Sequence, residues 1–275
     1  MSVLIVAKKE FNDAIRSQTL LILIGLFVLL QPVVALYAVV TGSNAEDGVP
    51  TAFFFTTAFV TVFLAPISAL TVSVKSIVRE RTLGTGKLLL SLPHTRGEIF
   101  FGKVLGRLAV FLTAVFVGFV PSIAIMMVGI DSFEPLHVVG MMVATVFFGV
   151  IFLVIGICAS TVMKSESMAA VVGIGIFVFV YWWDSIVFTI NAEFGLVDGR
   201  PLEFLSRFQL IIIGEDVANT IMWLTGHSET IASEAVVNGG DVPFYLHHWV
   251  SILFLATWIV VPLAVGYWAF NRTEF

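Results

Sequence analysis

Residues 19–40 read TLLILIGLFVLLQPVVALYAVV, a stretch without a charged side chain. About 20 such residues in a helix cross the hydrocarbon core of a bilayer, which is roughly 30 Å thick. The stretch is longer than the apolar region of a secretory signal peptide, and no small-residue cleavage site follows it. We therefore expect residues 19–40 to form a transmembrane helix.

The rest of the chain repeats this pattern. Of its 275 residues, 59% are hydrophobic and 12% are charged, whereas soluble domains carry about 25% charged residues. Because backbone groups in lipid must be paired within their own segment, the spans are expected to be helices. The composition therefore predicts an all-α polytopic membrane protein with one transmembrane domain over residues 1–275. Its six spans are expected at residues 19–40, 51–74, 108–130, 138–163, 168–190 and 249–270.

The basic residues predict how the chain crosses the membrane. With six alternating spans, 12 of the 14 Lys and Arg residues fall on one side, and only Arg200 and Arg207 fall on the other. Twelve of the 19 acids show the opposite preference. Because cytoplasmic loops carry an excess of Lys and Arg, we expect a multi-pass cell-membrane protein with both termini in the cytoplasm.

Proline and glycine residues inside the spans predict local features. Kinks are expected at Pro32, Pro66, Pro121 and Pro262. Close helix contacts are expected at Gly149, Gly156, Gly173 and Gly175, since a missing side chain lets two helices approach.

Two segments outside the spans also have helical periodicity. Apolar residues recur every four positions between residues 2 and 17, at Val3, Ala7, Phe11 and Ile15. This spacing predicts an amphipathic helix in the headgroup plane, and the alternative is an ordinary basic flank that only sets topology. The external connection 191–247 is too long for a structureless loop, so two short helices are expected in it. Their apolar positions are Leu202, Leu205, Phe208 and Ile212, then Val217, Ile221 and Leu224.

The connection Lys75–Arg107 is the most informative part of the chain. It reads KSIVRERTLGTGKLLLSLPHTRGEIFFGKVLGR. A leucine cluster from Leu88 to Leu92 is ended by Pro93, and Thr95 with Glu98 has the spacing of a helix capping box. These features predict a compact projection with exposed leucines that fits the groove of a partner protein. The alternative is a basic loop that serves topology alone.

Patterns for catalysis or metal binding are missing from the sequence. The stretch Gly84–Lys87 resembles a P-loop only superficially, because Arg81 occupies the position of its first glycine and Leu88 follows the lysine. There is no H-E-x-x-H or G-x-S-x-G pattern, and the adjacent pair His247 and His248 is too small a ligand set for a metal. We expect no enzymatic activity, and no metal or cofactor bound by this chain.

Asp184 is the only acid inside an expected span. Intramembrane charges often mark transport pathways, so Asp184 is a candidate for the transport path. The alternative is a hydrated acid at the outer interface, because Asp184 follows the aromatic set Tyr181, Trp182 and Trp183.

The cytoplasmic connection resembles that of ABC-2 type transporter permeases. Arg79–Thr85 resembles the family's E-R-E-x-G-T-like stretch. Leu88–Pro93, with Arg96, Glu98, Ile99, Gly102 and Lys103, is similar to the L-L-S-x-P-x-x-R-x-x-I-x-x-G-K stretch that follows it. Ala7–Phe11 is similar to the family's start, and the chain looks close to the group that includes the nitrous oxide reductase maturation permease.

The resemblance implies a mechanism. Two permease copies, or two related chains, would pair with two cytoplasmic ABC ATPase subunits that bind ATP and Mg²⁺. The projection Lys75–Pro93 would act as a coupling helix in a groove of the ATPase, and its movement would drive export of a substrate that the sequence does not identify. The implied ATPase contacts are Arg79, Glu80, Arg81, Thr82, Gly84, Leu88, Leu89, Leu92 and Pro93. The alternatives are an ATPase-independent six-span carrier or channel, or a membrane scaffold or regulator, and no nucleic acid is expected as a partner.

Overall fold

The computed structural model describes most of the chain and all six expected spans. The described residues are 3–16, 18–41, 45–46, 49–83, 95–131, 133–195, 204–205, 208–211, 213, 244 and 250–272. Within them, six helical segments are long and apolar enough to cross a membrane. The prediction of an all-α polytopic membrane protein is therefore confirmed.

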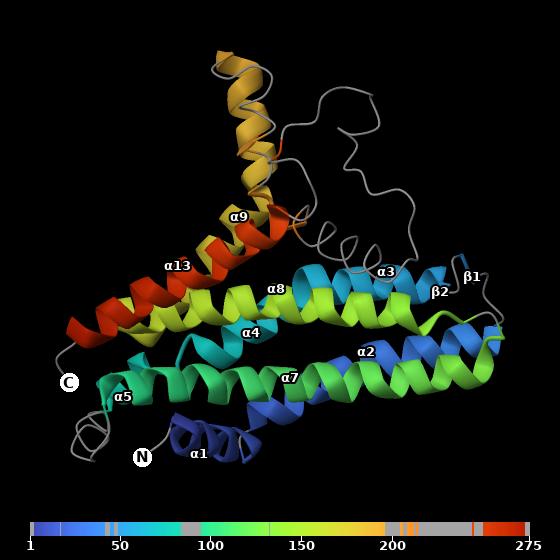
Figure 1. Ribbon diagram of the computed structural model, residues 1–275, viewed down its shortest axis with the longest axis horizontal. Helices are drawn as coiled ribbons and strands as arrows, with labels where there is room; N and C mark the ends of the chain where they lie inside the picture. Colours follow the sequence, from blue (N-terminus) through green and yellow to red (C-terminus); the bar gives the residue numbers. More distant parts are fainter. Residues whose placement is uncertain are drawn as a thin grey trace.

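The helices follow the expected order (Figure 1). An N-terminal helix, α1 (Val3–Ile15), precedes the first span, α2 (Gln18–Thr41). The second span is made of α3 (Thr51–Phe59), the π-helical turn η1 (Val60–Leu64) and α4 (Ala65–Ser73). The short helix α5 (Val78–Thr82) then leads toward the third span. The remaining spans are α7 (Arg96–Gly129), α8 (Pro135–Val162), α9 (Glu166–Phe194) and α13 (Ser251–Arg272). Two-residue antiparallel strands, β1 (Ala45–Glu46) and β2 (Val49–Pro50), join α2 to α3.

Helix α7 begins where the capping box was expected. The backbone N–H of Glu98 donates to Thr95 Oγ1 at 3.2 Å, and the N–H of Thr95 donates to Glu98 Oε2 at 2.9 Å. These two bonds satisfy amide groups that a helix start leaves without partners. Because the cap lies outside the apolar run, α7 begins at Arg96, about three turns before the expected start of the third span at residue 108.

The second span is interrupted at its only proline. Pro66 lacks an N–H donor, and the turn just before it is π-helical, with the N–H of Ala65 donating to the carbonyl of Val60. A π-bulge therefore separates α3 from α4 just before Pro66, where a kink was predicted.

Close contacts hold the centre of the bundle together. Along its length α7 packs against α2, and α8 packs against α4 and α13 (Figure 1). Phe27 of α2 and Phe111 of α7 meet edge to face, with ring centroids 6.5 Å apart. A Cβ at Gly149 would overlap the Phe111 ring, and one at Gly156 would overlap Ser73 Oγ.

The glycine predictions are therefore confirmed at Gly149 and Gly156. Gly173 also allows a close contact, because an added Cβ would lie 3.2 Å from Leu70 of α4. The prediction is wrong for Gly175, around which nothing lies within 4 Å of an added Cβ. Gly175 is next but one to Gly173 on a helix, so it points away from the face that meets α4.

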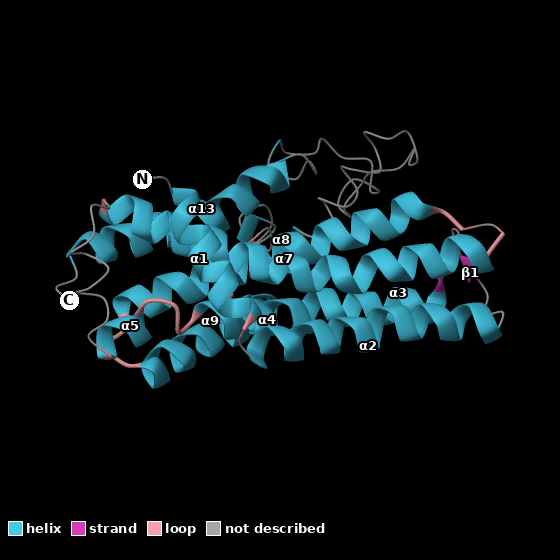
Figure 2. Ribbon diagram, turned by 90° about the horizontal axis from the view of Figure 1, so that it is seen from below, coloured by secondary structure: helices cyan, strands magenta, loops and turns pink. Residues whose placement is uncertain are grey.

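Helices α9 and α13 lie at the periphery of the bundle. The last turns of α9, Ser185–Phe194, stand away from the other spans in Figure 1. Figure 2 shows the other long helices running side by side, and both chain ends lie at the same end of the bundle as α5. We call this end the α5 end.

Parts of the 191–247 connection are described and are helical in their hydrogen bonding. The N–H of Phe208 donates to the carbonyl of Leu205 at 3.3 Å, and Phe208 packs on Phe254 of α13. The second helix expected in this connection, at Val217–Leu224, lies outside the described residues, as does the leucine cluster Leu88–Leu92.

Candidate functional site: the ion cluster at the α5 end

A buried lysine lies where three helices meet. Lys103, on α7, has 1% of its side chain exposed. Its Nζ donates to Glu10 Oε1 of α1 at 2.7 Å and to Glu80 Oε1 of α5 at 2.6 Å. One turn further along α7, Arg107 Nη2 donates to Glu10 Oε2 at 2.9 Å. We call Glu10, Glu80, Lys103 and Arg107 the ion cluster.

The ion cluster is formally neutral, with two acids and two bases. This balance matters because an unpaired buried charge is strongly unfavourable. Burial alone would raise the pKa of Glu10, but the ammonium of Lys103 and the guanidinium of Arg107 lower it, and the net effect is a pKa below the ordinary value. The carboxylate of Glu10 therefore stays ionised at neutral pH and holds α1 against α7.

Two glycines let α1 approach α7 closely enough for these bonds. A Cβ at Gly102 would lie 2.5 Å from Val6 Cβ, and one at Gly106 would lie 2.5 Å from Glu10 Cβ. Gly102 and Gly106 are one turn apart on α7, and this spacing is typical of helix pairs in close contact. They flank Lys103 in the sequence, so the same segment of α7 supplies both the approach and the charge.

The face of α1 that meets α7 differs from the expected one. The predicted amphipathic helix is present, but its buried residues are Val6, Glu10 and Ala14. Ile15, which was placed on the apolar stripe, is 47% exposed. The buried face is thus shifted by one position from the predicted one. Glu10 can lie on this face because Lys103 and Arg107 balance its charge.

Helix α5 is also attached to the other spans. Ser160 Oγ of α8 accepts hydrogen bonds from the N–H groups of Ile77 and Val78, at 2.9 and 3.0 Å. These bonds cap the start of α5 from another helix. Lys75, just before α5, pairs with Glu166 at the start of α9 at 3.5 Å.

The far end of the Lys75–Arg107 connection is tied to α13. Arg96 Nη1 donates to the carbonyl oxygens of Phe270 and Asn271, at 3.2 and 2.9 Å. These carbonyls belong to the last turn of α13, where a positive side chain is favourable. The connection Lys75–Arg107, which includes α5 and the start of α7, therefore contacts α1, α8, α9 and α13.

Comparison with known proteins agrees with this architecture. Residues 4–275 match the family model described as ABC-2 family transporter protein. The chain belongs to the ABC-2 transporter family. It is also 29% identical over 274 residues to a probable ABC transporter permease protein NosY of Stutzerimonas stutzeri, with 97% of both chains covered. A protein of the same description from Pseudomonas aeruginosa is 28% identical over the same share of both chains.

As an ABC-2 family member, the chain is a multi-pass membrane permease component of an ABC transporter. Permeases of this type work with an ABC ATPase. Within the described residues there is no group of three or more His, Cys, Asp or Glu side chains arranged to hold a metal ion.

The structure describes four of the nine expected ATPase contacts, all on α5. Arg79 is exposed and Arg81 half-buried, while Thr82 Oγ1 donates to the carbonyl of Arg79 at 3.0 Å. Glu80 turns toward the protein and bonds to Lys103, with 22% of its side chain exposed. Their role in ATPase contact remains a prediction, as it does for Gly84, Leu88, Leu89, Leu92 and Pro93, which lie outside the described residues.

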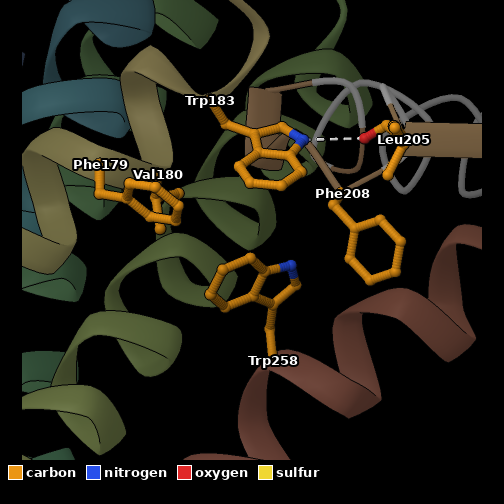
Figure 3. Close-up of a pocket in the computed structure, with 6 residues that line it drawn as sticks. All are labelled: Phe179, Val180, Trp183, Leu205, Phe208 and Trp258. Carbon is orange, nitrogen blue, oxygen red and sulfur yellow. Dashed lines mark hydrogen bonds between the residues drawn. The ribbon is translucent and has the colours of Figure 1, made fainter. Parts of the chain in front are cut away.

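Asp184 lies within α9, but its side chain is not among the described parts. Its neighbour Trp183 lines a cavity of about 320 Å³ between α9 and α13 (Figure 3). The lining is apolar, and the Trp183 indole N–H is already used by the carbonyl of Leu205 at 2.8 Å. The lining residues are Phe179, Val180, Trp183, Leu205, Phe208 and Trp258. The transport-path assignment of Asp184 stays a prediction.

Sequence reasoning did not predict the roles of Glu10, Lys103, Arg107 and Ser160 in this site. Glu10 belongs to the family-like start Ala7–Phe11, but it was not expected to be buried. Ser160 is a hydroxyl near the end of an apolar span, and such residues normally bond to their own helix. The one sequence signal near the cluster is the position of Lys103 between Gly102 and Gly106, which indicates a close helix contact but does not identify Glu10 as its partner.

Proposed function

We propose that this chain is the permease of an ATP-driven exporter, in which the Lys75–Arg107 connection docks on a separate ABC ATPase. Two copies, or two related chains, assemble with two ATPase subunits in the cell membrane. ATP and Mg²⁺ bind to the ATPase, and the permease itself carries out no chemistry. The α5 end faces the cytoplasm, as the 12 basic residues on that side support.

The ion cluster is the observation that supports this function best. We call Lys75–Pro93 the docking segment. Glu80, on α5 within this segment, binds Lys103 of α7, and Lys103 in turn binds Glu10 of α1. Because Lys103 and Glu10 are buried and each of the four charged groups has a partner of opposite sign, the cluster transmits a displacement of α5 to α7 and α1. A push on α5 by the ATPase would therefore move the third span and the N-terminal helix together.

The second span supplies a place where such a movement bends the bundle. Its π-bulge and Pro66 interrupt regular hydrogen bonding between α3 and α4. The α4 half is next to α5, whereas the α3 half contacts α2. ATP-driven displacement of α5 would rotate α4 against α3. This rotation would open the end of the bundle opposite the α5 end, and the substrate would leave there.

Docking is tested by replacing the leucines of the connection. Leu88→Asp together with Leu89→Asp should abolish co-purification of the ATPase while the permease still inserts, because buried charges destroy an apolar interface. The matched control is Leu88→Met together with Leu89→Met, which keeps apolar volume and should retain the ATPase. Normal ATPase co-purification with the double Asp variant would refute the assignment of the docking segment.

A further inference from the structure

A second cavity opens between α4 and α9, on the side of the bundle that carries Lys75. Its volume is about 370 Å³, within the range of small-molecule sites. One wall is formed by Ile67, Leu70 and Val74, and the other by Ala170, Ile174 and Val178. All six side chains are apolar, and Lys75 lies at one end of the groove.

The groove has the length of one membrane leaflet. From Ile67 to Lys75 and from Ala170 to Val178 the helices advance eight residues, or about 12 Å. Half of the hydrocarbon core of a bilayer is about 15 Å. Lys75 follows the end of α4 and Ala170 is near the start of α9, so the Lys75 end lies at the membrane surface and the Ile67 end near the midplane.

The groove is open at the surface of the single chain. Ile67 is 49% exposed and Ile174 is 58% exposed, although both belong to membrane spans. Gly173 lets α4 and α9 approach each other beside the groove, because a Cβ added there would lie 3.2 Å from Leu70 and 3.3 Å from Val74. Thr71 is the other polar residue in the wall, and its hydroxyl already donates to the carbonyl of Ile67 at 2.8 Å.

The charges at the open end favour an anion. The Lys75 side chain is 56% exposed, and among the described residues its ammonium makes one long contact, 3.5 Å, with Glu166. An ammonium carries three donors, so it can bind a second acceptor without releasing the first. Lys164 is exposed two residues before Glu166 and offsets its charge.

We propose that this groove binds an anionic phospholipid, with one acyl chain along the apolar walls and the phosphate at Lys75. An apolar slot of leaflet length with a cation at its aqueous end matches the two parts of such a lipid. The lipid would lie against α4 just after the π-bulge, in contact with the half-span that a movement of α5 would rotate. Only the assignment to the inner leaflet depends on the proposed function; lipid binding itself does not.

The site is tested with the full-length permease in nanodiscs, using lipids that carry a photoactivatable acyl chain. Phosphatidylglycerol should label residues 67–75 and 170–178 more than phosphatidylcholine does. Lys75→Ala should reduce this preference about fivefold, since one lysine at the surface of an anionic membrane has an effect of that size. Lys8→Ala, at an exposed lysine of α1, is the matched control and should leave the preference unchanged.

A second variant tests the apolar part of the groove. Ala170→Phe should fill it and reduce labelling by both lipids at residues 67–75 severalfold. Equal labelling by the two lipids in the unmodified protein would overturn the proposal. So would efficient disulfide cross-linking of two copies through Thr71→Cys in a Cys158→Ser background with no lipid label, since the groove would then be covered by a second copy of the chain.

Discussion

The α5 end of the bundle and its middle are held together by different chemistry. At the α5 end, four charged side chains form three short ion pairs in a buried site. In the middle, neutral groups meet: Thr57 Oγ1 donates to Gln31 Oε1 at 3.1 Å, and the hydroxyls of Thr61 and Thr145 are 2.6 Å apart. The difference is one of energy, because breaking a buried ion pair costs several times more than removing a neutral hydrogen bond in a membrane.

This contrast suggests a division of labour. The ion cluster holds α1, α5 and α7 as one body, since Lys103 of α7 pairs with an acid from each of the other two helices. The neutral contacts between the spans are weak enough to be exchanged, and Thr61 lies within the π-bulge itself. The helices at the α5 end would therefore move together, while the contacts between the spans in the middle of the bundle rearrange.

The largest expected effect comes from Lys103→Met. This change removes the shared partner of Glu10 and Glu80 and leaves excess negative charge in a buried site, so the free energy of unfolding should fall by about 3–5 kcal/mol. Denaturant unfolding of the purified permease measures it. Lys8→Met, at an exposed site of α1, should change the stability by less than about 0.5 kcal/mol. Equal stability of the two variants would show that the ion cluster does not hold the α5 end.

A smaller effect is expected from Glu10→Gln, and it should depend on pH. Removing the charged partner of Lys103 and Arg107 should lower the free energy of unfolding by about 1.5–3 kcal/mol at neutral pH. The pKa of Glu10 is lowered in the folded protein, so its contribution is complete above its ordinary pKa of 4.5 and is lost as the pH falls through the lowered value.

The stability difference between the wild type and Glu10→Gln should therefore shrink in acid. Unfolding curves recorded from neutral pH to below 4 would show the two proteins converging. A difference that is independent of pH would mean that Glu10 is not the ionised partner of the cluster.

The smallest effect is expected from Thr61→Val. Thr145 keeps its bond to the carbonyl of Met141 at 2.8 Å, so only the bond between the two hydroxyls is lost. Interhelical bonds of this kind are worth about 0.6 kcal/mol in a membrane. The same unfolding assay measures this value, and a loss as large as that of Lys103→Met would remove the contrast between the two regions.

The sequence was sufficient for the architecture because lipid imposes simple rules. Apolar runs predicted all six spans, and Thr95 with Glu98 predicted the start of α7, since both are local signals. The π-bulge was expected only as a kink at Pro66, because a proline shows where regular bonding fails but not how the turn before it adjusts.

The ion cluster could not be predicted in the same way. Glu10 and Lys103 are 93 positions apart in the chain, and nothing local indicates that they pair. Glu80 was predicted to contact the ATPase, and that role is untested; its pairing with Lys103 across 23 positions was not predicted. Pairings of this kind depend on how helices pack, and periodicity places a charged residue on the outer face by default.

The most direct test of the account separates docking from transmission. Glu80→Gln removes the charge that links α5 to Lys103, while Glu10 keeps Lys103 paired and the bundle folded. In a reconstituted complex, Leu88, Leu89 and Leu92 remain available for docking, so the ATPase should still bind this variant, but the effect of the permease on the rate of ATP hydrolysis should fall severalfold. An unchanged effect on hydrolysis, with binding intact, would contradict the claim that the ion cluster carries the movement of the docking segment into the membrane.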